Sequence, residues 1–171
     1  MELSKNFTLR EMTRSQTATR KGIDNNPTGT HQSNLVLLCQ NILQPLRDYY
    51  GRPLRVTSGY RSPELCIAIG SSVNSQHAKG QAADFEIPGV SNKELAEYIN
   101  ENLSYDQLIL EFFSPDEPNS GWVHCSYKNS EDNRKEYLIA FRDANGKTAY
   151  QKEYSDAAGG PTPEEVNESL I

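Results

Sequence analysis

The stretch SQHAKGQAADFEI, residues 75–87, joins one of the chain's three histidines to a carboxylate inside an apolar segment. Its second half, AADFEI, has the composition of a largely buried β-strand, and Pro88 and Gly89 after it favour a turn. A buried carboxylate is costly unless it is paired, so we expect Asp84 to have a partner elsewhere in the fold. The stretch therefore predicts a strand and a polar site on it.

Helical patterns precede this strand and recur once after it. Thr8, with Glu11 three residues later, fits a capping box that opens a short helix, and Ser91 begins the same pattern before a second helix. Residues 31–51 carry apolar side chains at helical spacing, and Pro45 is expected to kink or break this helix.

Strand patterns dominate the rest of the chain. They cover residues 53–62, 105–113, 122–127 and 136–154, the last with an Asn-Gly turn typical of a hairpin. We therefore expect an α+β fold, a small antiparallel sheet with helices packed on one side. One domain is expected over residues 1–154. A disordered tail is expected over residues 155–171, because that stretch is rich in Gly, Pro and polar residues.

The composition excludes several classes of protein. The chain has 171 residues, a length that suits one domain. Its formal net charge of −6 offers no wide basic surface for nucleic acid. No apolar run is long enough to span a membrane, and the polar start MELSKNFTLREM does not resemble a signal peptide. We expect a cytoplasmic monomer with no nucleic-acid partner and no membrane insertion. The cysteines are expected to be reduced thiols: Cys39, Cys66 and Cys125.

Two histidines and Asp84 form a candidate metal site. In WVHCSY, strand alternation puts Trp122, His124 and Ser126 on one face. Two imidazoles (His77 and His124) and one carboxylate suit zinc and leave a fourth position open, as in catalytic zinc sites. Taken singly, each of these residues could instead be a hydrogen-bonded core side chain. Small residues in the stretch would let the backbone pass close to an ion: Gly80, Ala82 and Ala83.

The run VTSGYRSPELCIAIGSSVNSQHAKGQAADFEI, followed by GWVHCSY, resembles the zinc D-alanyl-D-alanine carboxypeptidases of peptidase family M15, and most of all their short phage and prophage members. The family pattern S-x-H-x-x-G-x-A-x-D, with a later strand histidine, is met from Ser75 to Asp84 and at His124. The resemblance covers roughly residues 5–142. It implies that His77, Asp84 and His124 bind Zn²⁺, and that Arg61, Ser75 and Trp122 contact the substrate.

The activity implied by this resemblance is cleavage of the peptide stem of peptidoglycan, as a carboxypeptidase or an endopeptidase. Zinc lowers the pKa of a bound water and polarises the scissile carbonyl, while Arg61 would hold a carboxylate or the developing oxyanion. Without a signal peptide, a phage or prophage lysis enzyme (an endolysin) that accumulates in the host cytoplasm fits, and so does a virion-associated wall hydrolase.

The general base departs from the family pattern. Many relatives carry an acidic residue three positions before the last histidine, where this chain has Gly121. Glu111 is the first replacement: if residues 105–113 and 122–127 pair as a hairpin, it would lie beside the metal, with a pKa raised by burial. The other candidates are Asp116 and Glu117 in the following loop and Glu86 on the strand of Asp84.

Two other interpretations remain open from sequence. A catalytically silent, zinc-stabilised binding or virion structural module would explain Gly121, and a metal-free fold would make the histidines coincidental. Cys66 and Cys125 are interpreted as packing thiols rather than nucleophiles, and His31 as a surface or capping residue.

Overall fold

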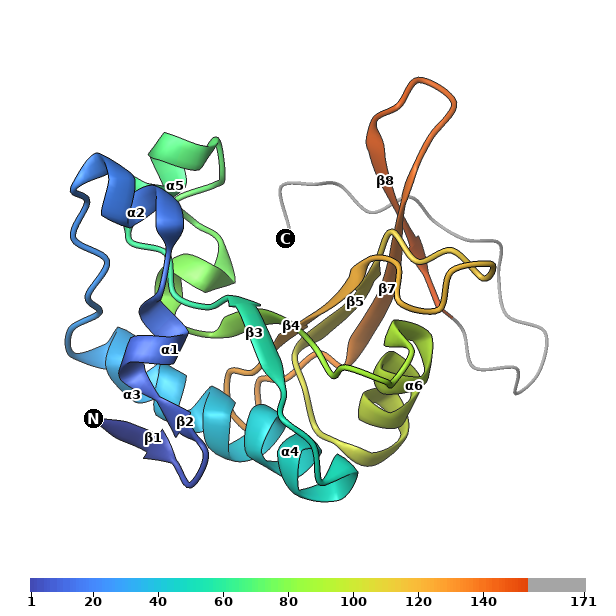
Figure 1. Cartoon of the computed structure of the whole chain (residues 1–171), viewed down its shortest axis with the longest axis horizontal. Helices are drawn as coiled ribbons and strands as arrows, with labels where there is room; N and C mark the ends of the chain where they lie inside the picture. The colour runs from blue at the N-terminus through green and yellow to red at the C-terminus, as the bar shows by residue number, and fades with distance from the viewer. Residues whose placement is uncertain (154–171) are drawn as a thin grey trace.

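The computed structural model describes residues 1–153 and has an α+β architecture (Figure 1). The helices are α1 (Leu9–Thr13), α2 (Gln16–Lys21), α3 (Thr30–Leu38), α4 (Gln44–Tyr50), α5 (Pro63–Ile69) and α6 (Asn92–Asn102), with a π-helical turn η1 (Cys39–Leu43) and a 3₁₀ turn η2 (Gln76–Lys79). The strands are β1 (Glu2–Ser4), β2 (Phe7–Thr8), β3 (Arg55–Ser58), β4 (Ala82–Glu86), β5 (Gln107–Glu111), β6 (Trp122–Ser126), β7 (Glu136–Arg142) and β8 (Thr148–Lys152).

The main sheet has six strands in the order β3-β4-β6-β5-β7-β8, and β1 with β2 forms a separate two-stranded sheet. The expected small antiparallel sheet is therefore wrong in size and in type, because β5 and β7 run parallel. Both edges of β6 are already used, by β4 and β5. The next strand, β7, joins at the free edge of β5, and because it runs antiparallel to β6 it is parallel to β5. The predicted hairpin of β7 and β8 is confirmed.

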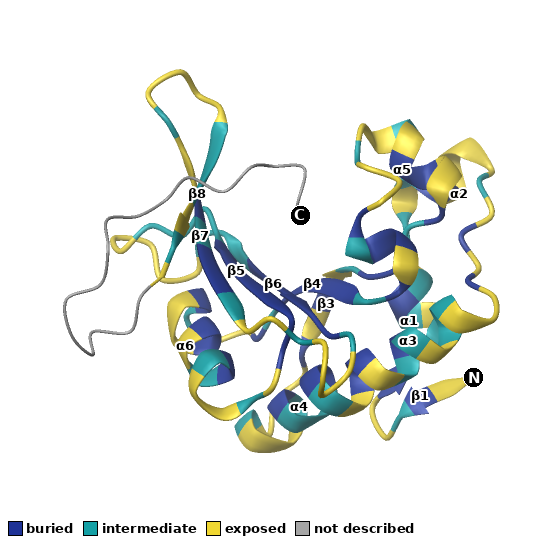
Figure 2. Ribbon diagram, turned by 180° about the vertical axis from the view of Figure 1, so that it is seen from behind, coloured by how far each residue is buried: buried dark blue, intermediate teal, exposed yellow. Residues whose placement is uncertain are grey.

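One face of the sheet packs against helices, as expected (Figure 2). Alternation directs Phe85, Leu110 and Val123 into the main core, where they meet apolar side chains of α3, α4 and α6. The core residues contributed by these helices are Leu35, Leu38, Leu46, Leu95, Ala96 and Ile99. The opposite face has only a small apolar cluster around Ile109 and Leu138, which leaves it free for polar side chains.

The long helix of residues 30–50 passes Pro45 without breaking. At η1 the helix widens, and the backbone N–H of Gln44 donates to the carbonyl of Cys39, five residues back. Proline has no N–H and its ring crowds the carbonyl four residues earlier, so a wider turn at this point relieves the clash. The helix ends at Gly51, whose φ of 61° is easiest for glycine.

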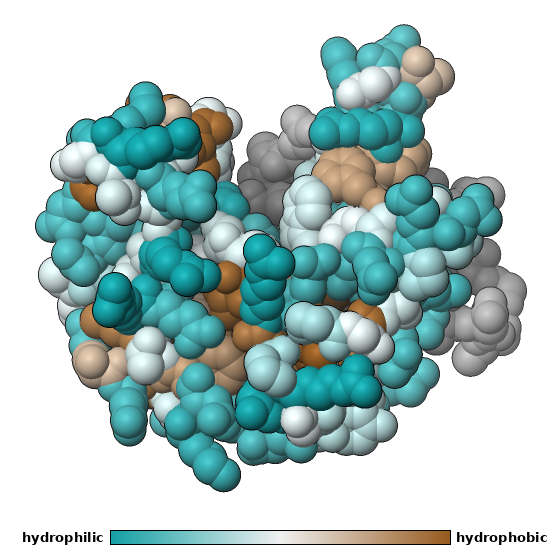
Figure 3. All heavy atoms as spheres, viewed as in Figure 1, coloured by the Kyte–Doolittle hydropathy of each residue, from teal (hydrophilic) through white to brown (hydrophobic). Residues whose placement is uncertain are grey.

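The predicted helix caps are confirmed. Thr8 accepts a hydrogen bond from the N–H of Glu11, and Ser91 accepts one from the N–H of Glu94. The three cysteines are buried and free. No helix within residues 1–153 is both long and apolar enough to cross a membrane, and the face seen in Figure 3 is mainly hydrophilic. The tail expected over residues 155–171 lies outside the described residues.

Candidate metal centre

Strand register brings Asp84 and His124 together on the face of the sheet away from the helices. Strands β4 and β6 are antiparallel neighbours, and Asp84 lies directly opposite His124. His77 comes from η2, one turn before β4, and Ser75 caps that turn by accepting a hydrogen bond from the His77 N–H (3.2 Å). Two adjacent strands and the turn leading into one of them are therefore sufficient to assemble the three side chains.

The three side chains converge on Asp84 Oδ1. This oxygen lies 2.9 Å from His124 Nδ1 and 3.4 Å from His77 Nε2. The three potential ligand atoms all lie within 4.8 Å of one another, and all three residues are buried. Ligands about 2.0–2.1 Å from a tetrahedral zinc are about 3.3 Å apart, so the spacing fits one ion. We call these three residues the His-Asp-His trio.

Two outer contacts orient the trio. His77 Nδ1 lies 2.7 Å from the carbonyl oxygen of Gly59, so Nδ1 carries the proton and the lone pair of Nε2 faces Asp84. Arg61 Nη2 lies 3.1 Å from Asp84 Oδ2 and so occupies the oxygen that does not face the imidazoles. Such contacts behind the ligands are what fix tautomer and orientation in protein metal sites.

The protonation states expected of the trio are those that a metal needs. Burial lowers the pKa of His77, an effect that Asp84 opposes only in part, so the imidazole is neutral near pH 7. Burial would raise the pKa of Asp84, but the contacts with His77 and His124 outweigh it and hold that pKa well below its usual range. A neutral His77 imidazole and an ionised Asp84 carboxylate are ready to coordinate without first losing protons.

One atom of the trio has no partner. His124 Nε2 is buried and makes no hydrogen bond within the described part of the chain. An unsatisfied buried ring nitrogen costs free energy that a structural core histidine normally avoids. The ring is held by its contact with Asp84 at Nδ1, which is the nitrogen on the side of the trio, so the unpaired Nε2 does not itself indicate a ligand atom.

The trio opens into a cavity of about 200 Å³, which we call the metal cavity. Its lining residues are Arg61, Ser71, Ser75, His77, Asp84, Glu111, Trp122 and His124. The three proposed metal ligands, the proposed substrate contacts Arg61, Ser75 and Trp122, and Glu111 thus all line one cavity. Ser71, to which no role was assigned from the sequence, lies 3.5 Å from Arg61 Nη1. Sequence reasoning missed Gly59, whose carbonyl role no sequence pattern signals.

Glu111 is the acidic residue of the metal cavity other than Asp84. The pairing predicted for its strand is confirmed: β5 and β6 are antiparallel, with Glu111 opposite Trp122, so Glu111 shares a face with His124 one pair away. Burial, helped by the charge of Asp84 and opposed by His124 and Arg61, raises the pKa of Glu111 to about 7. A carboxyl group with such a pKa can take up and release a proton near neutral pH.

The other candidate bases lie elsewhere. Glu86 accepts a hydrogen bond from Asn92 (3.3 Å) and lines a separate cavity with Arg55. Asp116 and Glu117 are exposed in the loop between β5 and β6. Glu111 is therefore the candidate that the fold brings to the trio.

Two expectations about neighbouring residues are corrected. Gly80 was expected to make room for an ion, but a Cβ at this position would overlap the carbonyl oxygen of His31, and its φ is +71°. The glycine is needed for close packing of η2 on α3. His31, interpreted from the sequence as a surface or capping residue, is half-buried in the first turn of α3, with its ring 5.9 Å from that of Tyr60.

A network of charged groups around the buried Asp106 contacts η2 through Gln76. Asp106 is fully buried, and its carboxylate receives hydrogen bonds from Gln76 Nε2 and from Arg134 Nε and Nη2, each at 2.9 Å. Lys128 Nζ lies 3.4 Å away. Burial opposes ionisation, but the Arg134 hydrogen bonds outweigh it and lower the pKa of Asp106 to about 2. Because Gln76 precedes His77, this network helps to position the trio.

The matched segment in comparisons with known proteins contains this whole site. The model of one protein family, Peptidase M15, matches residues 5–126, well over half of the chain. These residues include the trio, Arg61 and Glu111. No curated protein gives a significant match.

Proposed function

Because the chain belongs to the peptidase M15 family, we propose that it is a zinc-dependent peptidase that cleaves the peptide stems of bacterial peptidoglycan. In this proposal His77, Asp84 and His124 hold the ion and Glu111 is the general base. The observation that carries the proposal is that Glu111, the carboxyl group with the raised pKa, lines the same cavity as the trio.

The chemistry follows from the residues of the metal cavity. Zinc supplies an acidified water and polarises the scissile carbonyl. Glu111 accepts a proton from the water that attacks and returns it to the amine that leaves. Its pKa suits both steps, because a base needs to be ionised before attack and protonated before the amine departs.

Arg61 has two roles in the proposal. Its Nε donates a hydrogen bond to Ser58 Oγ at 2.9 Å, and its Nη2 donates one to Asp84 Oδ2. Arg61 therefore positions the metal-binding carboxylate, and because it also lines the metal cavity its guanidinium suits a substrate carboxylate or oxyanion. Trp122 and Ser75 complete the proposed substrate contacts, although Ser75 also caps η2.

The alternative, a catalytically silent zinc-stabilised module, drew its support from Gly121 at the position of the usual base. The presence of Glu111 in the metal cavity removes the need for an acid at 121 and favours the enzyme. Carboxypeptidase or endopeptidase action stays a prediction. A phage role, in lysis or in the virion, stays one as well. Residues 1–154 are proposed to act as one peptidase unit.

The test is digestion of purified peptidoglycan from several wall types, followed by mass spectrometry of the released fragments, with and without a chelator. We expect zinc-dependent loss of a defined stem residue or cross-link. Stoichiometric zinc binding without any bond cleaved would instead favour the silent module. Protein that binds no zinc would support a metal-free fold.

A further inference from the structure

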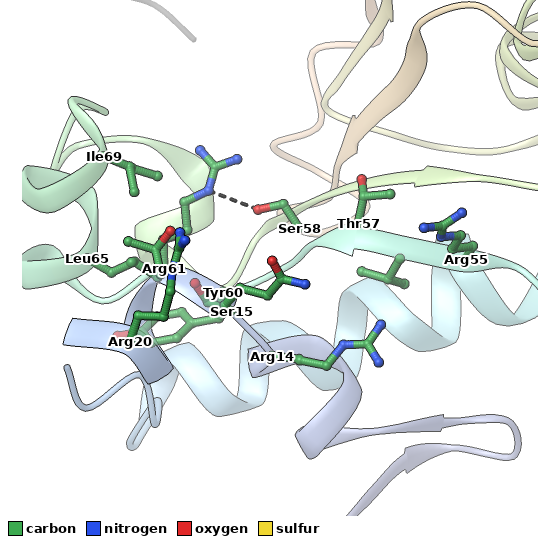
Figure 4. A pocket seen from close by; sticks show the side chains of 13 residues that line it. Arg14, Ser15, Arg20, Arg55, Thr57, Ser58, Tyr60, Arg61, Leu65 and Ile69 are labelled. Atoms are coloured by element: carbon green, nitrogen blue, oxygen red, sulfur yellow. Dashed lines mark hydrogen bonds between the residues drawn. The ribbon is translucent and has the colours of Figure 1, made fainter. Parts of the chain in front are cut away.

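A second cavity, next to the metal cavity, has a volume of about 560 Å³ (Figure 4). Four arginines line it, and we call it the arginine cavity: Arg14, Arg20, Arg55 and Arg61. They come from the end of α1, from α2, from β3 and from the segment before α5. Such a volume is typical of a site for a small ligand or a short peptide.

The arginine cavity concentrates positive charge in an acidic protein. None of the described residues that line it is acidic, although the chain has a net charge of −6. Within residues 1–153, the side chains of Arg14, Arg20 and Arg55 make no ion pair and no hydrogen bond. All three arginines are exposed, so water and salt screen their mutual repulsion, and a bound carboxylate would gain mainly from charge-assisted hydrogen bonds to them.

Nearby carboxylates do not neutralise the cavity. The charge of Glu11 influences Arg14, but the two groups form no ion pair. Glu86 lies opposite Arg55 across β3 and β4 and shares a second cavity with it, but its carboxylate forms no ion pair with Arg55 within residues 1–153 and accepts a hydrogen bond from Asn92.

Arg61 connects the two cavities, because it lines both. The two cavities are therefore adjacent, and the proposal places one substrate peptide across both, with its scissile bond at the trio. The rest of the arginine cavity suits a peptide as well. Hydroxyl groups of Ser15, Thr17 and Ser58 offer hydrogen bonds, and Leu65 and Ile69 offer an apolar wall for small side chains.

We propose that the arginine cavity is a substrate subsite that selects peptides carrying free carboxylates on one side of the scissile bond. This proposal rests on the proposed function. Its recognition element is the set of Arg14, Arg20 and Arg55, whose planar forks match carboxylates in paired hydrogen bonds. It predicts that amidation of the stem carboxylates weakens binding without touching the bond to be cut.

The test compares two synthetic peptides, L-Ala-γ-D-Glu-L-Lys-D-Ala-D-Ala and the same peptide with D-isoglutamine in place of D-Glu. Binding to zinc-loaded protein is measured by calorimetry, and cleavage is measured by chromatography. The triple variant Arg14→Gln, Arg20→Gln, Arg55→Gln removes the charges. The matched control is Arg10→Gln, because Arg10 is exposed and lines neither cavity. Circular dichroism checks that both variants fold.

We expect the native protein to prefer the D-Glu peptide by about tenfold at low salt. The triple variant should lose this preference through a higher KM and a weaker binding constant, whereas Arg10→Gln keeps it. Equal affinity of the native protein for the two peptides, or a preference that survives in the triple variant, overturns the subsite. Arginine-dependent binding without cleavage would leave the subsite standing and refute the peptidase. Cleavage of both peptides at equal efficiency would refute the subsite and leave the proposed peptidase standing.

Discussion

Gly121 lies so close to the backbone of Glu111 that a Cβ at position 121 would overlap the Glu111 carbonyl oxygen. The φ of Gly121 is also +68°, a conformation that other residues rarely adopt. The position that carries an acidic side chain in many members of the family is thus closed to every side chain here. The second carboxylate of the metal cavity, besides Asp84, comes instead from Glu111 itself, on the neighbouring strand.

Substitution of Gly121 by alanine should therefore destabilise the protein through both strain and overlap. A suitable control is Gly146→Ala, because Gly146 has a similar φ of +74° but open space around it. We expect Gly146→Ala to cost about 1 kcal/mol and Gly121→Ala about 1–3 kcal/mol more, measured by chemical denaturation. Equal losses at the two sites would show that the contact with Glu111 is relieved without cost.

Metal removal should abolish peptidase activity and lower the melting temperature, because a ligand that binds only the folded protein stabilises it. Dialysis against a chelator, followed by titration with zinc, should restore both at one equivalent per chain. His124→Ala should bind zinc far more weakly, as seen by metal analysis after gel filtration. If this variant retained one tightly bound zinc, the trio would not be the site.

Glu111→Gln should lower kcat by about 10²–10⁴-fold while zinc stays bound, because the amide keeps the shape of the side chain but cannot accept a proton. Glu86→Gln is the matched control, since Glu86 lies on the same face of the sheet but lines a different cavity. It should change kcat little. A comparable loss in the two variants would point away from Glu111 as the base.

The pKa of Glu111 has a consequence for stability in the metal-free protein. Burial raises it from 4.5 to about 7, so between these pH values the folded state holds a proton that the unfolded state has released. The stability of the native chain must then fall as pH rises through this window, whereas Glu111→Gln is not subject to this loss.

The two proteins should be about equally stable near pH 4, and the glutamine variant should be more stable above pH 7 by on the order of 1–3 kcal/mol. Thermal unfolding in the presence of chelator measures the difference. A constant difference across this pH range would mean that the carboxyl group is not desolvated.

Asp106→Asn should destabilise the protein by about 3–5 kcal/mol, because it leaves Arg134 without its buried partner. The pair Lys93–Glu97 (3.6 Å, exposed) provides a contrast, and Lys93→Gln should cost less than about 1 kcal/mol. The pKa of Asp106, lowered to about 2, means that its contribution is complete above about pH 4 and is lost as pH falls towards 2. Urea denaturation at pH 7 and at pH 3 tests both statements.

The sequence predicted which side chains share the site better than it predicted the strand order of the sheet around them. Asp84, Glu111 and His124 share a face because alternation in a strand is a local rule, and a hairpin between consecutive strands needs only one pairing choice. The parallel contact of β5 with β7 depends on which edges are already taken, so no local pattern signals it.

Features that depend on distant backbone contacts were also beyond sequence reasoning. The approach of Gly121 to Glu111 and the bond from His77 to the Gly59 carbonyl join segments that carry no shared pattern. The arginine cavity gathers single residues from four segments, each unremarkable where it stands in the sequence.

The network around Asp106 also joins the two sides of residue 126, where the family match ends. Gln76 belongs to the matched part, whereas Lys128 and Arg134 follow it. Cutting the chain after residue 126 would leave the buried carboxylate of Asp106 without these cations. It would also remove β7, the strand that pairs with β5. A segment transferred into a chimeric peptidase would therefore have to be longer than the matched residues and run at least to the end of β7.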